Sequence, residues 1–338
     1  MNRSSAVYGG MEKAKTIFMT ILIVLCVSSC SGQAPQENDG SVCVASWNVQ
    51  NLFNAVLDGG EYEEYKPASG WNQVMYERRL SNAAKVLSCL PDAGGYIIVL
   101  NEIEGPDVAE DLIKACDTGR MGLRWYACTR DEGCAVQSAV LSSLPVTGAR
   151  IHAVGEGLRP ILEVEIECGQ EKLFVLAVHF KSNLEGVQET AEARARAAAV
   201  VNRVSHAIGL ENPGCLVMVC GDMNDECWEN RTLGRSGVLR VSESFSRDSW
   251  YCFWMDSSRP VWPSGSYLYG GVWRNYDNIL LSQSASDGSG LEFDGAGVVF
   301  EGIIRTVDSR PAAWNRNLLT GVSDHLPVWV RLSPSSGT

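Results

Sequence analysis

The stretch Leu216-Val-Met-Val-Cys-Gly-Asp-Met-Asn-Asp225 joins a run of apolar residues to a glycine and two polar side chains. Its apolar residues lie between glycine-containing segments and predict a short, buried strand. Asp222 and Asn224 follow the end of this strand, and their spacing of two places both side chains on one side of an extended backbone. A carboxylate and an amide so placed can orient a water molecule and hold a phosphate or a metal ion. A capped turn is the alternative, because Asp, Asn and Gly are common turn residues.

Polar side chains stand beside the ends of other predicted strands as well. The chain contains only 4 histidines, and two of them occupy such positions. A repeated arrangement of this kind favours a shared site over a series of unrelated turns. The strands and their polar neighbours are Val42–Trp47 before Asn48, Tyr96–Leu100 before Glu102, Leu173–Val178 before His179, a short strand beginning at Asp277, and Val328–Leu332 after Asp324 and His325.

The chemistry of these side chains points to a hard divalent cation. Carboxylate and amide oxygens suit Mg²⁺, Mn²⁺ or Ca²⁺, whereas zinc sites prefer histidine and cysteine. The remaining histidines and carboxylates can transfer protons and bind phosphate oxygens. Metal-assisted displacement at phosphorus needs these parts: a cation, a base for water and a donor to the transition state.

Six short motifs contain the polar strand ends. They are Ser46-Trp-Asn-Val-Gln-Asn-Leu-Phe53, Leu100-Asn-Glu102, His179-Phe-Lys-Ser182, Gly221-Asp-Met-Asn-Asp225, Tyr276-Asp277 and Ser323-Asp-His-Leu-Pro327. They occur in the order seen in the endonuclease/exonuclease/phosphatase family, which this chain resembles from about Val42 to Leu332. That family includes deoxyribonuclease I, exonuclease III, inositol polyphosphate 5-phosphatases and bacterial sphingomyelinases. The resemblance implies an α/β fold, a four-layer α/β sandwich in which two packed mixed β-sheets are flanked by helices.

The resemblance also implies a role for each residue. Glu102 would be the principal ligand of Mg²⁺, or of Mn²⁺ or Ca²⁺, with Asn48 and Asp324 beside it. Asp222 would orient or deprotonate the attacking water. Asn224, His179 and His325 would contact the phosphoryl group, and Asp277 would hold His325 in the useful tautomer. Asn278 departs from the family, because many members have a histidine after this aspartate.

The amino terminus predicts export and lipid anchoring. Lys13 and Lys15 precede the apolar run 17–27, which is too short for a comfortable membrane span but suits a signal peptide. Val27-Ser28-Ser29-Cys30 resembles a bacterial lipobox. We therefore expect a lipoprotein signal peptide over residues 1–29, a flexible tether over 30–41 and one domain over 42–334. Cys30 would attach the protein to a membrane of the bacterial cell envelope.

The formal net charge is −12, which argues against tight, charge-driven binding to nucleic acid. Nucleic acid is still expected as the substrate, because a bound divalent cation reverses the local field of an acidic site. No obligate protein partner is inferred. The candidates for contacts to a nucleic-acid backbone, all of which could instead be solvated helix charges, are Arg78, Arg79, Lys181, Arg194 and Arg196.

Ten cysteines follow Cys30, and no Cys-x-x-Cys pair occurs among them, so a zinc ribbon or a thioredoxin-like site has no support. An exported protein permits disulfides. Cys128 and Cys134 flank Arg130-Asp131-Glu132-Gly133 and could close a hairpin with a disulfide. Cys43 and Cys220 lie in predicted strands and are expected to be buried thiols.

Three functions remain open on the sequence. The first is a metal-dependent exported nuclease, with endonuclease or exonuclease action. The second is a phosphodiesterase or phosphatase that acts on a lipid headgroup or another small phosphoester, like a sphingomyelinase. The third is a surface binding protein without catalysis, which is disfavoured because every expected polar residue is present.

Overall fold

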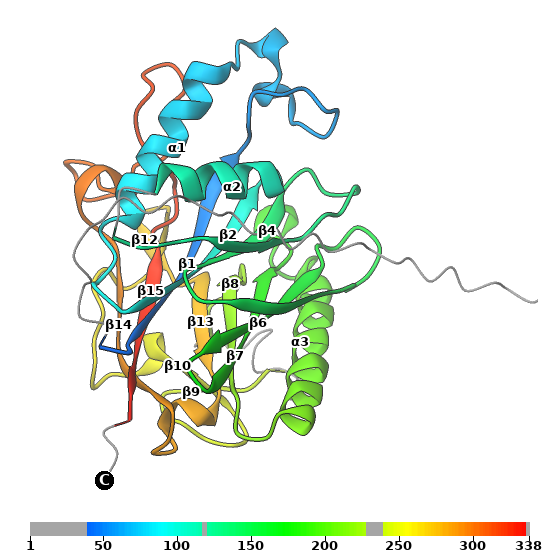
Figure 1. Ribbon diagram of the computed structural model, residues 1–338. Coiled ribbons are helices and arrows are strands. Elements are labelled where there is room, and N and C mark those ends of the chain that lie inside the picture. The colour runs from blue at the N-terminus through cyan, green and yellow to red at the C-terminus, as the bar shows by residue number, and fades with distance from the viewer. Residues whose placement is uncertain (1–38, 117–119, 228–238, 336–338) are drawn as a thin grey trace, which may run out of the picture.

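The computed structural model describes residues 39–116, 120–227 and 239–335. Within these ranges the strands form a six-stranded sheet, a seven-stranded sheet and a separate hairpin (Figure 1). The predicted signal peptide and most of the predicted tether lie outside the described residues. In the order of their neighbours, the first sheet contains β14 (Leu291–Val298), β15 (Val328–Pro334), β1 (Val42–Leu52), β2 (Gly95–Ile103), β4 (Gln137–Ser142) and β3 (Trp125–Cys128).

The second sheet and the hairpin complete the β-structure. The second sheet contains β5 (Val146–His152), β6 (Ile161–Cys168), β7 (Glu171–His179), β8 (Leu216–Asp222), β13 (Asp277–Leu281), β10 (Trp250–Cys252) and β9 (Val241–Ser242). The hairpin pairs β11 (Tyr267–Tyr269) with β12 (Val272–Arg274). Single turns of 3₁₀-helix occur at Glu63–Tyr65, Pro67–Ser69, Asn183–Glu185, Phe253–Met255, Gln283–Ser286 and Gly302–Ile304.

Three α-helices in the described part of the chain cover the outer faces of the two sheets. They are α1 (Gln73–Leu87), α2 (Pro106–Ala115) and α3 (Ala191–Glu211). In Figure 1, α1 and α2 lie at the top beside β1 and β2, and α3 lies on the right beside β6 and β7. Both large sheets are mixed, since β1–β2 and β7–β8 pair in parallel and most other pairs are antiparallel. The predicted four-layer α/β sandwich is confirmed.

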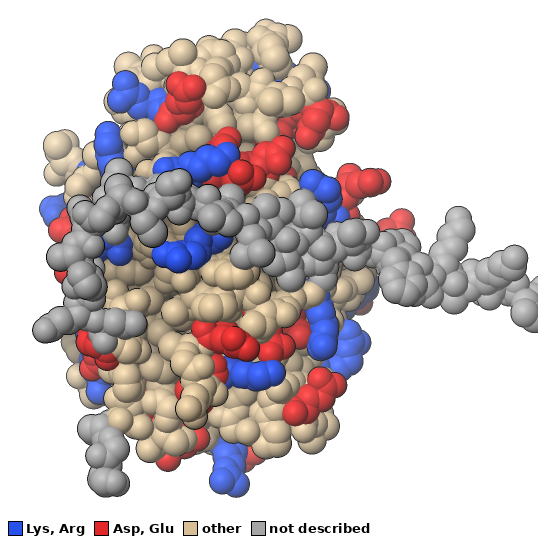
Figure 2. All heavy atoms as spheres, in the orientation of Figure 1, with Lys and Arg blue, Asp and Glu red and all other residues tan. Residues whose placement is uncertain are grey.

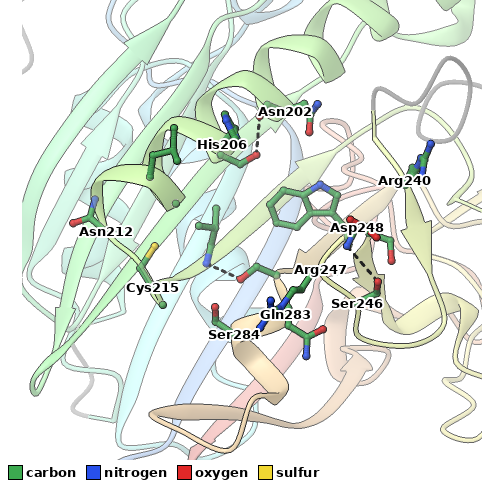
Figure 3. Close-up of a pocket in the computed structure, with 18 residues that line it drawn as sticks. Asn202, His206, Asn212, Cys215, Arg240, Ser246, Arg247, Asp248, Gln283 and Ser284 are labelled. Atoms are coloured by element: carbon green, nitrogen blue, oxygen red, sulfur yellow. Dashed lines mark hydrogen bonds between the residues drawn. The ribbon is translucent and has the colours of Figure 1, made fainter.

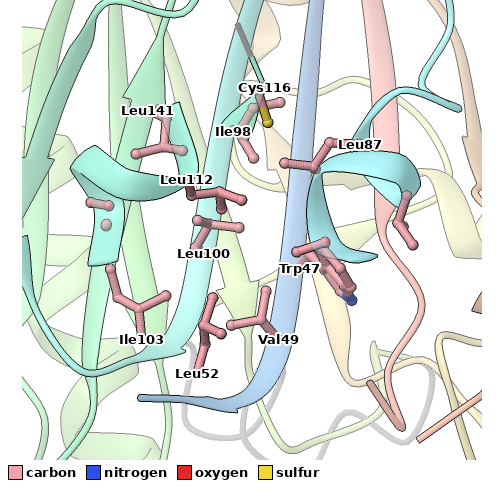
Figure 4. Close-up of a cluster of buried hydrophobic side chains, with 14 of the residues drawn as sticks. Trp47, Val49, Leu52, Leu87, Ile98, Leu100, Ile103, Leu112, Cys116 and Leu141 are labelled. Carbon is pink, nitrogen blue, oxygen red and sulfur yellow. The ribbon is translucent and has the colours of Figure 1, made fainter. Parts of the chain in front are cut away.

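The alternation of side chains along the strands creates the layers. In β1, Cys43, Ala45 and Trp47 face the cluster that α1 and α2 cover, whereas Val42 and Val44 face the space between the sheets. This period of two is the ordinary geometry of a strand buried on both faces. Figure 4 shows part of the helix-covered cluster, in which Leu87 of α1 and Leu112 of α2 lie against strand residues such as Leu100. A third cluster joins α3 to the second sheet.

The strand register brings the polar strand ends together. Asn48 of β1 lies opposite Asn101 of β2 in a parallel pair. In the second sheet, Asp222 of β8 lies opposite His179 of β7 on one side and opposite Asp277 of β13 on the other. The carboxyl ends of neighbouring parallel strands meet at one edge of a sheet, and this is where the predicted residues gather.

The prediction that the backbone stays extended from Asp222 to Asn224 is wrong. Asn224 has a φ of 48°, in the left-handed region, and its N–H donates to Asp222 Oδ1 at 2.9 Å. The aspartate side chain therefore closes a turn here, as the capped-turn alternative predicted. Gly221 is needed just before it, because a Cβ there would lie 1.8 Å from the carbonyl oxygen of Val178.

The predicted disulfide between Cys128 and Cys134 is absent, and both residues are free thiols. Cys128 lies in β3 opposite Ala139 of β4, whereas Cys134 lies in the turn between the strands. Gln137 holds this turn instead, because its amide accepts from Thr129 Oγ1 at 2.8 Å and donates to the carbonyl oxygen of Cys134 at 2.7 Å. The predicted buried thiols Cys43 and Cys220 are confirmed, since both are 0% exposed.

Two of the five predicted cationic contacts are structural. Arg79 of α1 is 2% exposed and donates to the carbonyl oxygens of Asn51 at 2.6 Å and of Val49 and Gln50 at 2.7 Å. Arg194 of α3 is 0% exposed and donates to Thr190 Oγ1 at 2.6 Å. Neither side chain is solvated or free to meet a nucleic acid, because each is enclosed by the chain that it holds in place.

We expect Arg79→Met to lower the free energy of unfolding by about 3 kcal/mol or more, because several buried carbonyl oxygens lose a charged donor. Arg196→Met is the matched control, because Arg196 lies exposed on α3 and pairs with Glu192, four residues before it on the same helix. The control should cost less than about 0.5 kcal/mol. Urea unfolding followed by circular dichroism measures both variants, and equal midpoints would contradict this account of Arg79.

Candidate active site

A cavity of about 640 Å³ opens at the edge where the strand ends meet. Asp277 does not line this cavity and is 0% exposed, behind His325. The other seven predicted residues all line it. They are Asn48, Glu102, His179, Asp222, Asn224, Asp324 and His325.

Asp222 lies at the centre of the site and is 2% exposed. Its Oδ2 accepts from Asn48 Nδ2 at 3.1 Å, and its backbone N–H donates to Asn101 Oδ1 at 2.8 Å. Burial, above all, raises the pKa of Asp222 to about 6, against the lowering effect of the His325 charge. Asp222 is therefore ionised at neutral pH and still basic enough to accept a proton from a water molecule.

Glu102 has the backbone and side-chain features of a fixed ligand. Its φ of 65° is in the left-handed region, which is uncommon for a glutamate and turns its side chain into the cavity. Glu102 Oε1 accepts from Asn48 Nδ2 at 2.9 Å, and Oε2 accepts from the N–H of Asn51 at 3.0 Å. These bonds orient the carboxylate and leave further lone pairs directed at the cavity.

The cavity residues fit a hard divalent cation. Glu102, Asp222 and Asp324 supply three carboxylates to one cavity, an arrangement that oxygen-preferring cations stabilise. Asn48 presents its amide N–H₂ to Glu102 and Asp222, while its Oδ1 accepts from the N–H of Gln50 at 3.0 Å. In this orientation Asn48 holds the two carboxylates in place. Asn48 could bind the cation directly only if its side-chain amide flipped so that Oδ1 faced the cavity.

A second arrangement of possible ligands overlaps the first. Ligand atoms of Asp222, Asp277 and His325 lie within 4.8 Å of one another, but all three residues are buried. Asp277 Oδ2 is already bonded to His325 Nδ1 at 2.7 Å and accepts from Ser266 Oγ at 2.6 Å. We therefore assign the cation to the Glu102 side of the cavity and the Asp277–His325 pair to proton and charge control.

His325 carries a positive charge at neutral pH. Burial acts to lower its pKa, but the charge of Asp277 and the hydrogen bond to it outweigh burial, and the pKa of His325 stands well above its usual value. Asp222 and Asp324 act in the same direction. The imidazolium faces the cavity, where it can donate a hydrogen bond to a phosphoryl oxygen and stabilise the charge that develops there.

His179 is the neutral counterpart of His325. Its side chain is buried, and burial, followed by the charges of Arg159 and His325, holds the pKa of His179 well below its usual value. Its Nε2 lies 3.7 Å from Glu102 Oε1 and 3.9 Å from Asp222 Oδ2. A neutral His179 and a charged His325 can both bind a phosphoryl group at this cavity, and no positive charge has to be buried at His179.

Several residues that shape the site carry no signal in their own sequence positions. Ser266 bonds Asp277, and the ring of Tyr267 stacks on His325 with centroids 4.5 Å apart. Arg159 lines the cavity from the loop between β5 and β6. Asn101 alone could have been found, because it directly precedes Glu102 at the end of a predicted strand.

Asn278, where the chain departs from the family pattern, is structural. It is 0% exposed, and its Nδ2 donates to the carbonyl oxygen of Asn275 at 2.8 Å. Its Oδ1 faces Cys252 Sγ at 3.6 Å. The residue after Asp277 therefore points into the protein and takes no part in proton transfer at the cavity.

Another cavity of about 640 Å³ lies at the opposite end of β8 (Figure 3). It is lined by Val217 near the start of that strand, with His206 on α3 and Arg247 and Gln283 on the facing segments. None of the eight predicted residues lines it. The cavity at the Asp222 end of the strand is therefore the candidate active site.

Comparison with known sequences agrees with this geometry. A sequence model of the Endonuclease/Exonuclease/phosphatase family matches residues 43–334. The chain therefore belongs to this family, whose enzymes hydrolyse phosphoester bonds with a divalent metal ion, and it is a phosphoester hydrolase. A search of curated protein sequences found no significant match.

Solved structures with the same fold have low sequence identity to this chain. TDP2 from Caenorhabditis elegans is 19% identical with a TM-score of 0.55, and the alignment covers 89% of this chain and 77% of that one. TDP2 from D. rerio, solved with a single-strand DNA product, is 16% identical with a TM-score of 0.53 and coverage of 87% and 99%. A mannosyl-6-phosphatase from Bacteroides thetaiotaomicron is 15% identical with a TM-score of 0.53 and coverage of 86% and 98%.

We expect Asp277→Asn to lower kcat for bis(p-nitrophenyl) phosphate by about 100-fold. The substitution removes the charge that raises the pKa of His325, so the alkaline limb of the pH profile should move to lower pH. The acid limb, set by Asp222 with its pKa of about 6, should stay closer to its original position. Rates measured from pH 5 to 10 at saturating Mg²⁺ test this.

The matched control is Asp287→Asn, which removes an exposed carboxylate from the loop before β14. It should leave both limbs and kcat unchanged. An alkaline limb that stays in place in Asp277→Asn would show that the pair does not control the charge of His325.

Proposed function

We propose that this protein is a nuclease that cleaves phosphodiester bonds of nucleic acid by attack of water at phosphorus. The proposal rests on the arrangement of Asp222, Glu102 and His325 around one open cavity, with Asp277 bonded to His325 from behind. The cavity supplies an ionised base, a fixed carboxylate for a cation and a protonated donor. A nuclease needs all three at one phosphodiester.

Each residue has a defined task in this reaction. Asp222 accepts a proton from the attacking water, and Asn48 and Asn101 hold its carboxylate and backbone in place. His325 donates to a phosphoryl oxygen, and Asn224 contacts the same group. A Mg²⁺ ion held by Glu102 and Asp324 would neutralise the phosphate charge. Mn²⁺ and Ca²⁺ have the same preference for oxygen ligands and remain alternatives.

A small phosphoester is the second candidate substrate. The net charge of −12 opposes long-range attraction of a polyanion. Lys and Arg alternate with Asp and Glu on the face in Figure 2, without an extended basic surface. The structural neighbours include both a DNA-bound TDP2 and a sugar phosphatase. A lipid headgroup or sugar phosphate would enter the same cavity.

We expect the protein to degrade plasmid and single-stranded DNA with Mg²⁺ or Mn²⁺, and EDTA to abolish the activity. Asp222→Asn should lower the rate by at least about 100-fold, because the base is lost. Asp248→Asn, at the far cavity, is the control and should match the wild type. Retained activity in Asp222→Asn would contradict the mechanism. If DNA stays intact while a sugar or lipid phosphoester is hydrolysed, only the nuclease assignment is contradicted.

We further propose export and a lipid anchor at Cys30 in the bacterial cell envelope. The support is the Lys13–Lys15 segment, the apolar run 17–27 and the lipobox-like sequence before Cys30. These residues lie outside the described part of the chain. In the residues that the structure describes, no helix has the length and apolarity to cross a membrane.

Expression of the full chain in a bacterial host tests the anchor. We expect labelling by radioactive palmitate and recovery in the membrane fraction, both lost in Cys30→Ser. Cys26→Ser, within the apolar run, is the control and should remain labelled. Unlabelled wild-type protein would contradict lipid attachment.

A further inference from the structure

A side cavity of about 190 Å³ opens beside the candidate active site. Tyr62, Arg159 and His179 line both cavities, so the side cavity adjoins the position of the phosphoryl group. Its other polar wall is formed by Lys181, which follows β7. None of the described residues that line it is an aspartate or a glutamate. The protein has a net charge of −12, so a cavity lined by cations without carboxylates is locally favourable to anions.

Arg159 is the principal charge of this side cavity. Its side chain is half-buried, and within the described ranges it makes no hydrogen bond and no ion pair. The two other non-histidine cations at these cavities are already paired, Arg274 with Glu226 at 2.8 Å and Lys181 with Glu185 at 2.7 Å. An unpaired guanidinium at the wall of a cavity retains all its donors for a ligand.

The backbone at Arg159 is conformationally restricted. Arg159 precedes Pro160, whose ring disfavours the helical conformation for the residue before it. Pro160 is buried, and β6 begins at Ile161, which is 1% exposed. The backbone of Arg159 is therefore held at the start of a buried strand, and little backbone ordering is needed when an anion binds.

The position of Arg159 suits a second anion more than the reacting phosphoryl group. The reacting group must lie among Asp222, Asn224 and His325. None of these three lines the side cavity, which shares only Tyr62, Arg159 and His179 with the central cavity. Arg159 is near enough to His179 to help lower the pKa of His179, after burial. A substrate whose scissile phosphate contacts His179 could place a neighbouring phosphate against Arg159.

We propose that Arg159 and the side cavity form a subsite for a second phosphate group of the substrate. Phosphate oxygens match the forked donors of a guanidinium, and Lys181 adds a second positive charge when it exchanges Glu185 for the ligand. The substrate class is then a phosphoester with two phosphates close together, such as neighbouring positions of a nucleic-acid strand or a bisphosphate. This inference deepens the proposed function and rests on it.

Turnover of two matched substrates tests the subsite. Thymidine 5′-(p-nitrophenyl phosphate) has one phosphate, and its 3′-phosphorylated counterpart has the same leaving group with a second phosphate. We expect the wild type to show a kcat/KM about tenfold higher or more for the second, since a charged hydrogen bond has this strength. Arg159→Ala should remove the advantage, and Arg159→Lys should retain part of it. Arg196→Ala, on the exposed face of α3, should keep all of it.

Binding to the Mg²⁺-loaded protein supplies a readout that needs no turnover. Calorimetry compares thymidine 5′-monophosphate with thymidine 3′,5′-bisphosphate, and the dinucleotide TpT with pTpT. At least one pair should show about tenfold tighter binding of the ligand with the extra phosphate. Arg159→Ala should abolish that difference. Adding TpTpT distinguishes an internal phosphodiester of a strand from a terminal phosphate as the bound group.

The outcomes separate the two proposals. Absence of hydrolysis with a preserved binding difference would overturn the proposed function and support the subsite. If the protein hydrolyses both substrates and Arg159→Ala lowers kcat/KM by the same factor for each, the subsite is overturned, because the arginine would then act on the scissile phosphate. A wild type without preference for the added phosphate in either assay would also overturn it.

Discussion

The burial of the Asp222 carboxylate is the constraint on which the rest of the site depends. A charge removed from water is costly unless hydrogen bonds and opposite charges replace its hydration. Asn48 Nδ2 and the N–H of Asn224 donate to the Asp222 carboxylate, and His325 faces it with a positive charge. The Asn48–Asp222 bond also joins the two sheets, since Asn48 belongs to β1 and Asp222 to β8. The proposed catalytic carboxylate is thereby part of the contact that aligns the layers.

Two buried arginines support this junction from either side. Arg79 binds three consecutive carbonyl oxygens in the last residues of β1, directly before Leu52. Arg194 binds the segment that follows β7, through the carbonyl oxygen of Val187 at 2.7 Å, and lies 3.6 Å from Asp225 Oδ2. Each cation replaces backbone hydrogen bonds that a strand end cannot make with a neighbour. The two segments that carry Asn48 and His179 are thus fixed before any ligand arrives.

The site separates its charges by environment. Asp277 raises the pKa of His325, whereas burial lowers that of His179, so two histidines at one cavity differ in charge at neutral pH. Acidic groups gather on the Glu102 side, and the side cavity beyond His179 has Arg159 and Lys181. A phosphoester with a second phosphate matches this arrangement, with one phosphate among the carboxylates and histidines of the main cavity and the other against the Arg159 guanidinium. In the proposed subsite, local charge and not the net charge of the protein would govern recognition.

The sequence alone determined the fold class and the residues that gather at the candidate active site. Asn48, Glu102, His179 and Asp222 each follow a run of apolar residues, and the strand period of two makes such ends visible without coordinates. The family resemblance supplied the four-layer sandwich and the pairing of Asp277 with His325, and the structure shows that pair at 2.7 Å. Strand interiors were predictable because apolar periodicity is a local property.

Only the tertiary structure decided what depends on contacts between distant segments. The sequence could not distinguish a solvated arginine from one enclosed by carbonyl oxygens, so Arg79 and Arg194 were misjudged. It could not place Cys134 in a turn away from Cys128, because pairing of cysteines depends on register. The bond of Ser266 to Asp277 and the place of Arg159 at a cavity lined by residues of both sheets have no signal in the sequence, because they arise only when these segments pack. Side-chain identity is local, whereas charge state and proximity arise from the packed chain.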